Sequence, residues 1–219
     1  MPSLQLTSDR AQRFGLLLVA IVAELMLGPL LAESELGPHA LQFMAILVMI
    51  TVLWAVGVHR ASVLLFVPML ATHVLAAYSG STSLLVASLM LRLVFIGYAT
   101  GLIMWRTLRQ PDVTLDTIAG AASAYALLAV VWGNLYVLIE VFHPGSFNIP
   151  ASWLLGPARD PVAGLVYFSF ITLTTVGYGD ITPAWPGAGG LAVAEAFVGQ
   201  LYLAITVARL VGLHTSRRP

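Results

Sequence analysis

The chain has 219 residues, of which 59% are hydrophobic and 9% are charged, with a formal net charge of zero and no cysteine. Soluble domains carry about a quarter charged residues, so this composition predicts an all-α protein embedded in a lipid bilayer. Zero net charge gives no reason to expect a nucleic-acid partner, and the lack of cysteine excludes disulfides and thiolate metal sites.

Six stretches are long and apolar enough to cross a bilayer, which takes about 20 residues. They run over residues 14–32, 40–58, 61–78, 83–105, 118–142 and 189–213. The first stretch is long enough to span and is followed by further spans, so we do not expect it to be a cleavable signal peptide. The sequence therefore predicts a multi-pass protein with six transmembrane helices.

The arginines divide unequally between the two sides of these spans. If both termini are cytoplasmic, the cytoplasmic side holds Arg10, Arg13, Arg60, Arg106, Arg109, Arg217 and Arg218, with Arg209 near the inner end of the last span. The other side then holds Arg159 alone, together with Glu33, Glu35, Asp160 and Asp180. Because basic loops stay in the cytoplasm, we expect cytoplasmic termini and a location in the cell's inner (plasma) membrane.

Two charged residues lie in the middle of predicted spans, where a charge is costly and is usually paired or functional. Glu24 is in the first span and Arg92 is in the fourth. We favour an ion pair that holds the first four helices together. The alternative is that Arg92 is a reduced voltage sensor and Glu24 is its countercharge. A lone histidine, His73 in the third span, is more often hydrogen-bonded than a ligand or a proton sensor.

Residues 106–117 form the one polar cytoplasmic segment of any length, and Pro111 interrupts it. We expect this linker to separate a peripheral domain, residues 1–105, from a second domain, residues 118–219. Between the last two spans, residues 143–161 are rich in proline and glycine and predict an exposed turret.

The most specific motif follows this turret. The run Thr174-Thr175-Val176-Gly177-Tyr178-Gly179-Asp180 comes after a short apolar segment, residues 162–174, that includes Tyr167 and Phe168. A lone Gly-x-Gly would mean little, but the complete motif between an apolar half-helix and an apolar helix is hard to reach by chance. Over roughly residues 118–214 the chain resembles the potassium channel superfamily, whose selectivity filters carry this sequence.

The resemblance implies a re-entrant pore helix at 162–174 and a filter loop at 175–180, between the fifth and sixth helices. It also implies a homotetramer, because each chain supplies one filter loop and a pore needs four. K⁺, the permeant ion, would be coordinated by carbonyls along the filter, at Thr175, Val176, Gly177, Tyr178 and Gly179. The implied supports of the filter are Thr174, Asp180, Tyr167 and Phe168. No cofactor and no small-molecule substrate is expected.

The chain also departs from patterns known in this superfamily. Some small bacterial members have a pore-helix glutamate that bonds to the filter aspartate, but the matching residue here is Ile171. A voltage-sensing fourth helix carries an arginine at every third position, whereas residues 83–105 hold Arg92 alone. We therefore expect a voltage-sensor-like layout with weak voltage dependence or none.

The last span carries the candidate residues for gating. Gly199 stands where potassium channels often have a hinge glycine, one turn after Glu195 and before Gln200. We slightly favour Glu195 packed behind the filter and bonded to the pore helix, with Gln200 near the cavity or a subunit seam. The alternative is an acidic ring of four Glu195 side chains in the cavity. Below the hinge lies a four-residue repeat that could form a hydrophobic gate or subunit packing: Leu203, Val207 and Val211.

Several functions compete for this chain. A potassium-selective channel is the main expectation, and a non-conducting regulatory subunit of a potassium channel or transport complex is the alternative. A transporter subunit with four degenerate filter loops is disfavoured, because this chain has one loop with the full motif. An enzyme is not expected, because the sequence has no nucleophile–base set, phosphate loop or metal cluster.

Overall fold

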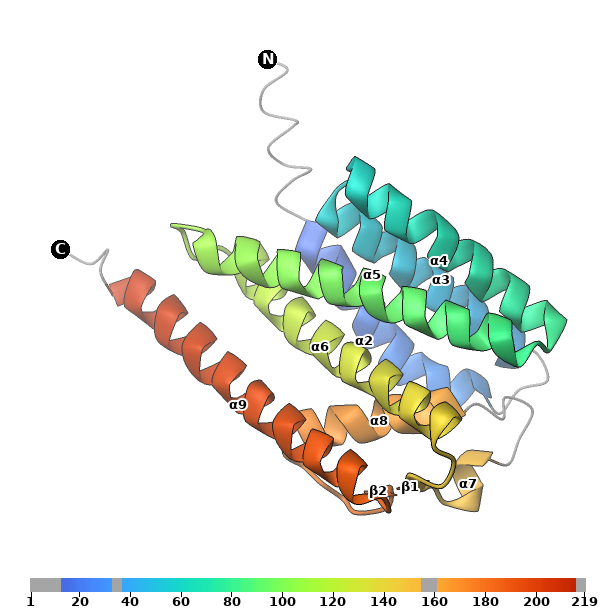
Figure 1. Cartoon of the computed structure of the whole chain (residues 1–219). Coiled ribbons are helices and arrows are strands. Elements are labelled where there is room, and N and C mark those ends of the chain that lie inside the picture. Colours follow the sequence, from blue (N-terminus) through green and yellow to red (C-terminus); the bar gives the residue numbers. More distant parts are fainter. Residues whose placement is uncertain (1–12, 33–36, 155–160, 216–219) are drawn as a thin grey trace.

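The computed structural model describes residues 13–32, 37–154 and 161–215. These residues form long helices, two short helices and one two-stranded sheet (Figure 1). The elements are α2 Arg13–Ala32, α3 Gly37–Val56, α4 Arg60–Ser79, α5 Thr82–Arg109, α6 Leu115–Phe142, β1 Phe147–Asn148, α7 Ala151–Leu154, α8 Pro161–Leu173, β2 Thr182–Pro183 and α9 Pro186–Thr215.

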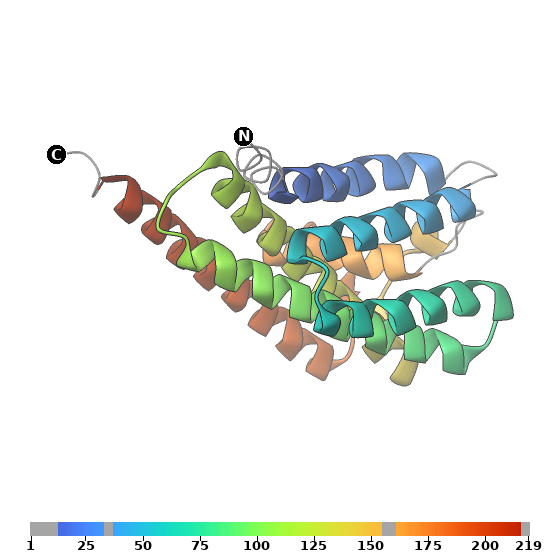
Figure 2. The same cartoon turned by 90° about the horizontal axis from the view of Figure 1, so that it is seen from above.

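The first four helices, α2 to α5, lie together on one side of α6, and the short helix α8 packs on α6 and α9 (Figures 1 and 2). The start of α2, the end of α5, the start of α6 and the end of α9 lie toward the same end of the molecule (Figure 1). The sheet and the start of α9 lie at the opposite end. Consecutive long helices therefore run in alternating directions, as in a chain that crosses a membrane repeatedly.

Five helices of the described part of the chain are long and apolar enough to cross a bilayer: α3, α4, α5, α6 and α9. The prediction of a helical, multi-pass membrane protein is therefore confirmed. Helix α2 covers the first predicted span but is not one of these five, so the division into six spans stays a prediction.

Several helices extend beyond the apolar stretches that predicted them. Helix α5 continues to Arg109, and α6 begins at Leu115 after its N-cap Thr114, whose Oγ1 accepts a hydrogen bond from the Thr117 amide at 3.2 Å. Apolar composition marks the part inside the bilayer, whereas helix ends depend on caps and on proline. The linker expected at 106–117 is thus reduced to residues 110–114, and Pro111 lies within it, where it prevents α5 from continuing.

The charge asymmetry holds for the described arginines near the helix ends. Arg13 and Arg60 begin α2 and α4, and Arg106 and Arg109 lie in the last turn of α5, all at one end of the bundle. Of the other charged residues used to predict the orientation, Arg209 lies inside α9 and Asp180 lies in the loop before α9. The rest lie outside the described residues: Arg10, Glu33, Glu35, Arg159, Asp160, Arg217 and Arg218.

Two apolar clusters hold these helices together. The larger one joins α2, α3, α4 and α5 to the first half of α6, with buried residues such as Phe95 and Ile103, and reaches Tyr202 of α9. The smaller one surrounds Tyr136 and Leu165, where α6, β1, α8 and the start of α9 meet. Helix α6 contributes to both clusters, so it connects the peripheral helices to the loop that carries the filter-like motif.

Candidate functional site

Helix α8 is held against α6 by close packing. A Cβ atom on Gly133 of α6 would lie 2.7 Å from the Val166 Cα of α8, so glycine is what allows this approach. On the same side the Phe168 ring packs edge-on against Tyr136 and Phe147, at centroid distances of 5.3 and 5.5 Å. Phe168, predicted to support the motif, is therefore buried between the sheet and α6.

The end of α8 directs the chain into the motif. The Thr174 Oγ1 donates to the Phe170 carbonyl at 2.6 Å. The amides of Val176 and Gly177 both donate to the Ile171 carbonyl, at 2.9 and 3.1 Å. Ile171 thus contributes a backbone acceptor, and no carboxyl group, at this position. Helix C-termini carry a partial negative charge, and here that end lies beside Thr175.

The backbone of the motif alternates in handedness. Thr175, Gly177 and Gly179 have positive φ angles of 60°, 56° and 80°, and the intervening Val176 and Tyr178 do not. In an extended chain of uniform handedness, successive groups point to opposite sides. Changing the sign of φ at every second residue allows successive carbonyls to point the same way. Thr175 is the one described non-glycine residue with positive φ, which is strain of the kind found at functional sites.

The motif is exposed in the single chain. Residues 174–180 are all exposed, and the Tyr178 side chain is 73% exposed. In a membrane protein an irregular segment of this kind must be covered by protein or line a water-filled path, because lipid cannot satisfy its backbone groups.

Beyond the motif, the chain is fixed at its outer end by two contacts of Asp180. The Tyr167 hydroxyl of α8 lies close to the Asp180 carboxylate, and the Ile181 amide donates to Asp180 Oδ1 at 3.0 Å. Trp153 of α7 stacks on the Tyr167 ring at 4.7 Å. The turret and α8 therefore meet at the residue that ends the motif.

The segment after Asp180 is tied to the start of the turret. Strands β1 and β2 pair in antiparallel fashion, with Phe147 opposite Pro183. The Ser146 carbonyl accepts from the amides of Ala184 and Trp185, at 2.8 and 3.1 Å, and the Trp185 ring stacks on His143 at 4.9 Å. These contacts close the loop between α6 and α9 at its outer side.

Glu195 of α9 is fully buried behind α8. Its carboxyl group accepts a hydrogen bond from the Tyr136 hydroxyl of α6 at 2.6 Å and a short one from the Ser169 hydroxyl of α8. Ser169 also lies 2.7 Å from the Ala129 carbonyl of α6. Glu195 therefore bridges three helices, which fits the favoured interpretation better than an acidic ring in a cavity, and its role in a pore stays a prediction.

Gly199 of α9 lies against the end of α8. A Cβ atom there would be 2.7 Å from Leu173 Cδ1 and 2.9 Å from the Leu173 carbonyl oxygen. The same carbonyl accepts a hydrogen bond from the Tyr125 hydroxyl of α6 at 2.8 Å. The Tyr125 ring stacks on Tyr202 of α9 at 5.7 Å. Gly199 therefore has a packing role in this structure, and a role as a hinge stays a prediction.

Helix α9 has two unlike faces. Glu195, Gly199, Tyr202 and Thr206 recur at helical spacing and are buried against α6 and α8. The residues predicted to lie at the inner pore or a subunit seam are on the exposed part of the helix: Gln200, Leu203, Val207 and Val211. Since these exposed residues are largely apolar, the face suits lipid, a cavity or a neighbouring subunit better than bulk water.

The charged residues of the peripheral helices lie apart from this site. Arg92 of α5 acts electrostatically on Glu24 of α2 and on His73 of α4, so the three groups are neighbours. The ion pair between Glu24 and Arg92 and the alternative of a reduced voltage sensor with its countercharge both stay predictions.

Sequence analysis did not identify the hydroxyl groups behind α8. Tyr125 and Tyr136 of α6, Ser169 of α8 and Tyr202 of α9 each donate a hydrogen bond across helices. The feature of the sequence that could have identified these residues is that each is a polar side chain in an apolar helix. Their partners could not be read from the sequence, because the pairs are separated by 26 to 81 residues.

Comparisons with known proteins agree with the position of this site. Residues 155–215 match a family model described as "Ion channel". "Two pore potassium channel c" of Oryza sativa subsp. japonica is 40% identical over 68 residues, which are 31% of this chain and 14% of that protein. "Protein LctB" of Bacillus caldotenax is 28% identical over 118 residues, 54% of this chain and 87% of that protein. No solved structure matches the chain.

The family match covers α8, the motif and all of α9. It identifies an ion-channel domain in the C-terminal part of the chain, in a family of channels and not of enzymes. Together with the rice relative, of which the aligned region is a small part, it supports the potassium channel superfamily.

Proposed function

We propose that the chain is one subunit of a homotetrameric, potassium-selective channel in the cell's inner (plasma) membrane. The observation that carries this proposal is the alternating backbone at Thr175, Gly177 and Gly179 within the Thr-Val-Gly-Tyr-Gly motif. A dehydrated K⁺ ion needs oxygen ligands that replace its water shell, and rings of backbone carbonyls supply them. One chain supplies one quarter of each ring. The motif would then be exposed in a single chain, as it is here, and covered by the other three chains in the tetramer.

In the proposed pore, carbonyls along Thr175, Val176, Gly177, Tyr178 and Gly179 coordinate the ion, and K⁺ occupies sites between Thr175 and Tyr178. The C-terminal end of α8 points its partial negative charge toward the inner end of this path. Passage down the gradient needs no cofactor and no covalent step.

The surroundings keep this path in place. Tyr167 holds Asp180 at the outer end. Glu195 and Ser169 fix α8 from behind, and Gly199 lets α9 lie close under its last residue. We propose that the exposed face of α9, with Gln200, Leu203, Val207 and Val211, lines the inner cavity or the seams between subunits.

A K⁺ flux assay on purified protein in liposomes tests this function. We expect K⁺ flux that barium blocks and that Na⁺ does not replace. The variant Gly177→Ala should lose selectivity or flux, because a side chain disfavours the positive φ by roughly 1–2 kcal/mol in each of four subunits.

The control is Gly145→Ala in the turret. Gly145 also has a positive φ, of 83°, with open space around its Cβ position, but it lies outside the motif. Equal K⁺ and Na⁺ flux through the native protein, or unchanged selectivity in Gly177→Ala, would remove the filter assignment.

A further inference from the structure

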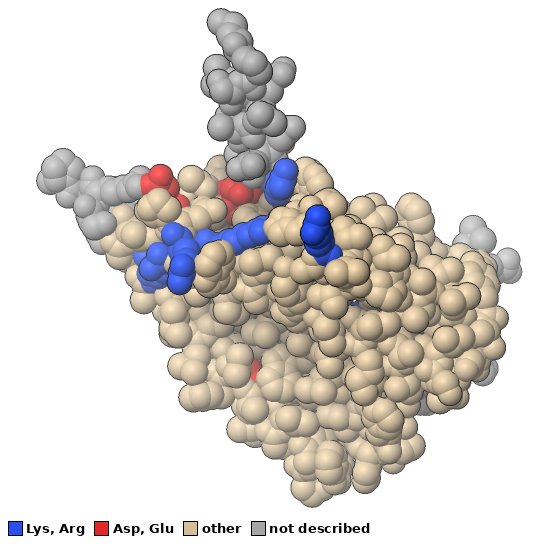
Figure 3. Space-filling view, turned by 45° about the horizontal axis from the view of Figure 1, so that its top comes forward, with Lys and Arg blue, Asp and Glu red and all other residues tan. Residues whose placement is uncertain are grey.

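A basic cavity of about 560 Å³ lies at the end of the bundle where α2 and α6 begin and α5 ends. Figure 3 shows the arginine side chains gathered at this end, above a surface that is largely uncharged. The charged and aromatic residues of the lining are Arg13, Phe14, His59, Trp105, Arg106, Arg109 and Asp116.

The arginines of this cavity are oriented by other contacts. Arg106 is fixed, since Nη1 donates to the Val56 carbonyl at 2.6 Å and Nη2 lies 3.1 Å from His59 Nε2. The guanidinium groups of Arg13 and Arg109 lie over the rings of Trp54 and Trp105, 5.4 and 4.7 Å from the ring centres.

The charge of the cavity suits an anion, because, of the described residues, three arginines and a single carboxylate, that of Asp116, line it. The Asp116 carboxylate accepts a hydrogen bond from the Phe14 amide at 3.2 Å. Within the described residues, Arg13 Nε is buried and has no hydrogen-bond partner. Planar guanidinium groups of this kind match the geometry of a phosphate, which accepts two parallel hydrogen bonds.

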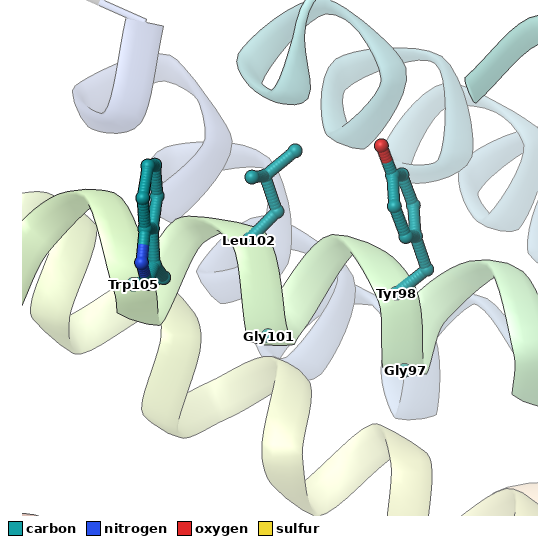
Figure 4. A pocket seen from close by; sticks show the side chains of 5 residues that line it. All are labelled: Gly97, Tyr98, Gly101, Leu102 and Trp105. Atoms are coloured by element: carbon teal, nitrogen blue, oxygen red, sulfur yellow. The ribbon is translucent and has the colours of Figure 1, made fainter. Parts of the chain in front are cut away.

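A shallow, open apolar groove on α5 shares Trp105 with this cavity. It has a volume of about 480 Å³ and is lined by Gly97, Tyr98, Gly101, Leu102 and Trp105 (Figure 4). The side chains of Tyr98, Leu102 and Trp105 stand along the helix, while the two glycines leave its surface bare. A Cβ atom on either glycine would meet no atom within 4 Å.

Trp105 belongs to the linings of both spaces. Gly97, Gly101, Trp105 and Arg109 also recur every fourth residue, so they lie along one face of α5. This face changes from apolar to basic toward the end of the helix. A free phosphate would use the basic end alone, whereas a molecule with a phosphate and a long apolar chain would use both.

We propose that this face of α5 binds one anionic phospholipid of the cytoplasmic leaflet, with its phosphate on Arg13 and Arg109 and an acyl chain along the Gly97–Gly101 groove. The proposal rests on the proposed function and on the cytoplasmic termini that the sequence predicts. Anionic lipids are attracted to arginines next to the cytoplasmic ends of membrane helices, and tryptophan is enriched at the same level.

Binding of defined lipids to the purified protein in neutral detergent, measured by native mass spectrometry, tests the proposal. The probes are dioleoylphosphatidylglycerol, dioleoylphosphatidylcholine and glycerol 3-phosphate. Two arginines near one headgroup predict about a thirtyfold preference for phosphatidylglycerol over phosphatidylcholine. Glycerol 3-phosphate should not displace the lipid, because it lacks the acyl chain.

Two matched pairs of variants locate the site. The double variant Arg13→Gln, Arg109→Gln should lose the preference for phosphatidylglycerol, whereas Arg60→Gln, at an exposed arginine outside the cavity, should keep it. Gly101→Leu should weaken binding of both lipids by filling the groove. Ala71→Leu, which adds the same side chain to an exposed position of α4, should not.

Three results would overturn the proposal: no preference for phosphatidylglycerol, an equal loss in Arg60→Gln, or displacement by glycerol 3-phosphate, which would indicate a site for free phosphates. None of these measurements depends on ion flux. A protein that binds the lipid but does not select K⁺ would leave this inference standing and would contradict the proposed function alone.

Discussion

The carboxyl group of Glu195 lies among apolar side chains, where its two hydrogen bonds are essential. A buried polar group without a partner costs more than a typical hydrogen bond contributes, so Tyr136 and Ser169 must be present together with Glu195. Because these residues come from α6, α8 and α9, the cluster determines how deeply α8 is set between the other two helices. The position of α8 in turn sets the position of Thr175, two residues after the helix ends.

We expect Tyr136→Phe to destabilise the protein by about 1–3 kcal/mol, because the hydroxyl donor to a buried carboxyl group is lost while the ring and its packing remain. Thermal unfolding in detergent measures this change. The matched control is Tyr78→Phe on α4, whose side chain is 75% exposed. Equal unfolding temperatures for the two variants would show that the Tyr136–Glu195 bond contributes nothing to stability.

Gly199→Ala should destabilise the protein by about 1–3 kcal/mol and lower K⁺ flux, because the new methyl group overlaps Leu173 and pushes α9 away from α8. Gly190→Ala is the control on the same helix, since its Cβ position has no neighbour within 4 Å. A variant at Gly199 that retains native stability and flux would show that this close packing is not needed. Lower flux at native stability would favour a hinge.

At the scale of elements, α5 is the helix that the resemblance places where a voltage sensor would be, and it carries one charge in its middle part. Arg92 is that charge, and Arg106 and Arg109 lie in its last turn beside the basic cavity. One elementary charge crossing the whole field contributes about 2.3 kcal/mol per 100 mV. Glu24 lies near Arg92, so attraction between opposite charges would oppose a movement of Arg92 across the field.

We therefore expect a shallow relation between conductance and voltage, with at most one gating charge per subunit. Electrophysiology on protein in planar bilayers gives this slope, and Arg92→Gln should flatten whatever dependence remains. A steep curve in the native protein, equivalent to many charges per tetramer, is the result that this interpretation cannot accommodate.

The long helices were predictable because their signal is local. Apolar composition located α3, α4, α5, α6 and α9 to within a few residues, and the filter-like motif is contiguous in the sequence. The contacts behind α8 were not predictable, since Tyr136 and Glu195 are 59 residues apart and neither has a spacing that identifies its partner. Likewise, the position of Gly199 in the sequence suggested a hinge. Its close contact with Leu173 could not be predicted, because that contact depends on how α8 and α9 cross.

At the scale of the whole molecule, the proposed pore needs more than one chain. The motif is exposed along its length, and α9 exposes large apolar side chains such as Val193, Phe197 and Ile205. Lipid can cover apolar side chains, but it cannot satisfy the backbone groups of residues 174–180. Four chains around a common axis would cover this segment and place four copies of it around one water-filled path.

We expect the purified protein to have a mass of four chains in detergent, after correction for bound detergent. Light scattering combined with size-exclusion chromatography measures this mass, and chemical cross-linking in native membranes should give a ladder that ends at four. A monomer or dimer in both experiments would contradict the proposed assembly.

The reversal potential of single channels with K⁺ on one side of a planar bilayer and Na⁺ on the other tests the central claim most directly. Filter selectivity sets this potential, and neither the number of channels nor their open probability affects it. We predict a strongly shifted potential, of the sign given by K⁺ passing and Na⁺ being excluded, and loss of the shift in Gly177→Ala. A reversal potential near zero in the native protein would mean that both ions pass equally, and the account of a carbonyl filter for K⁺ would be wrong.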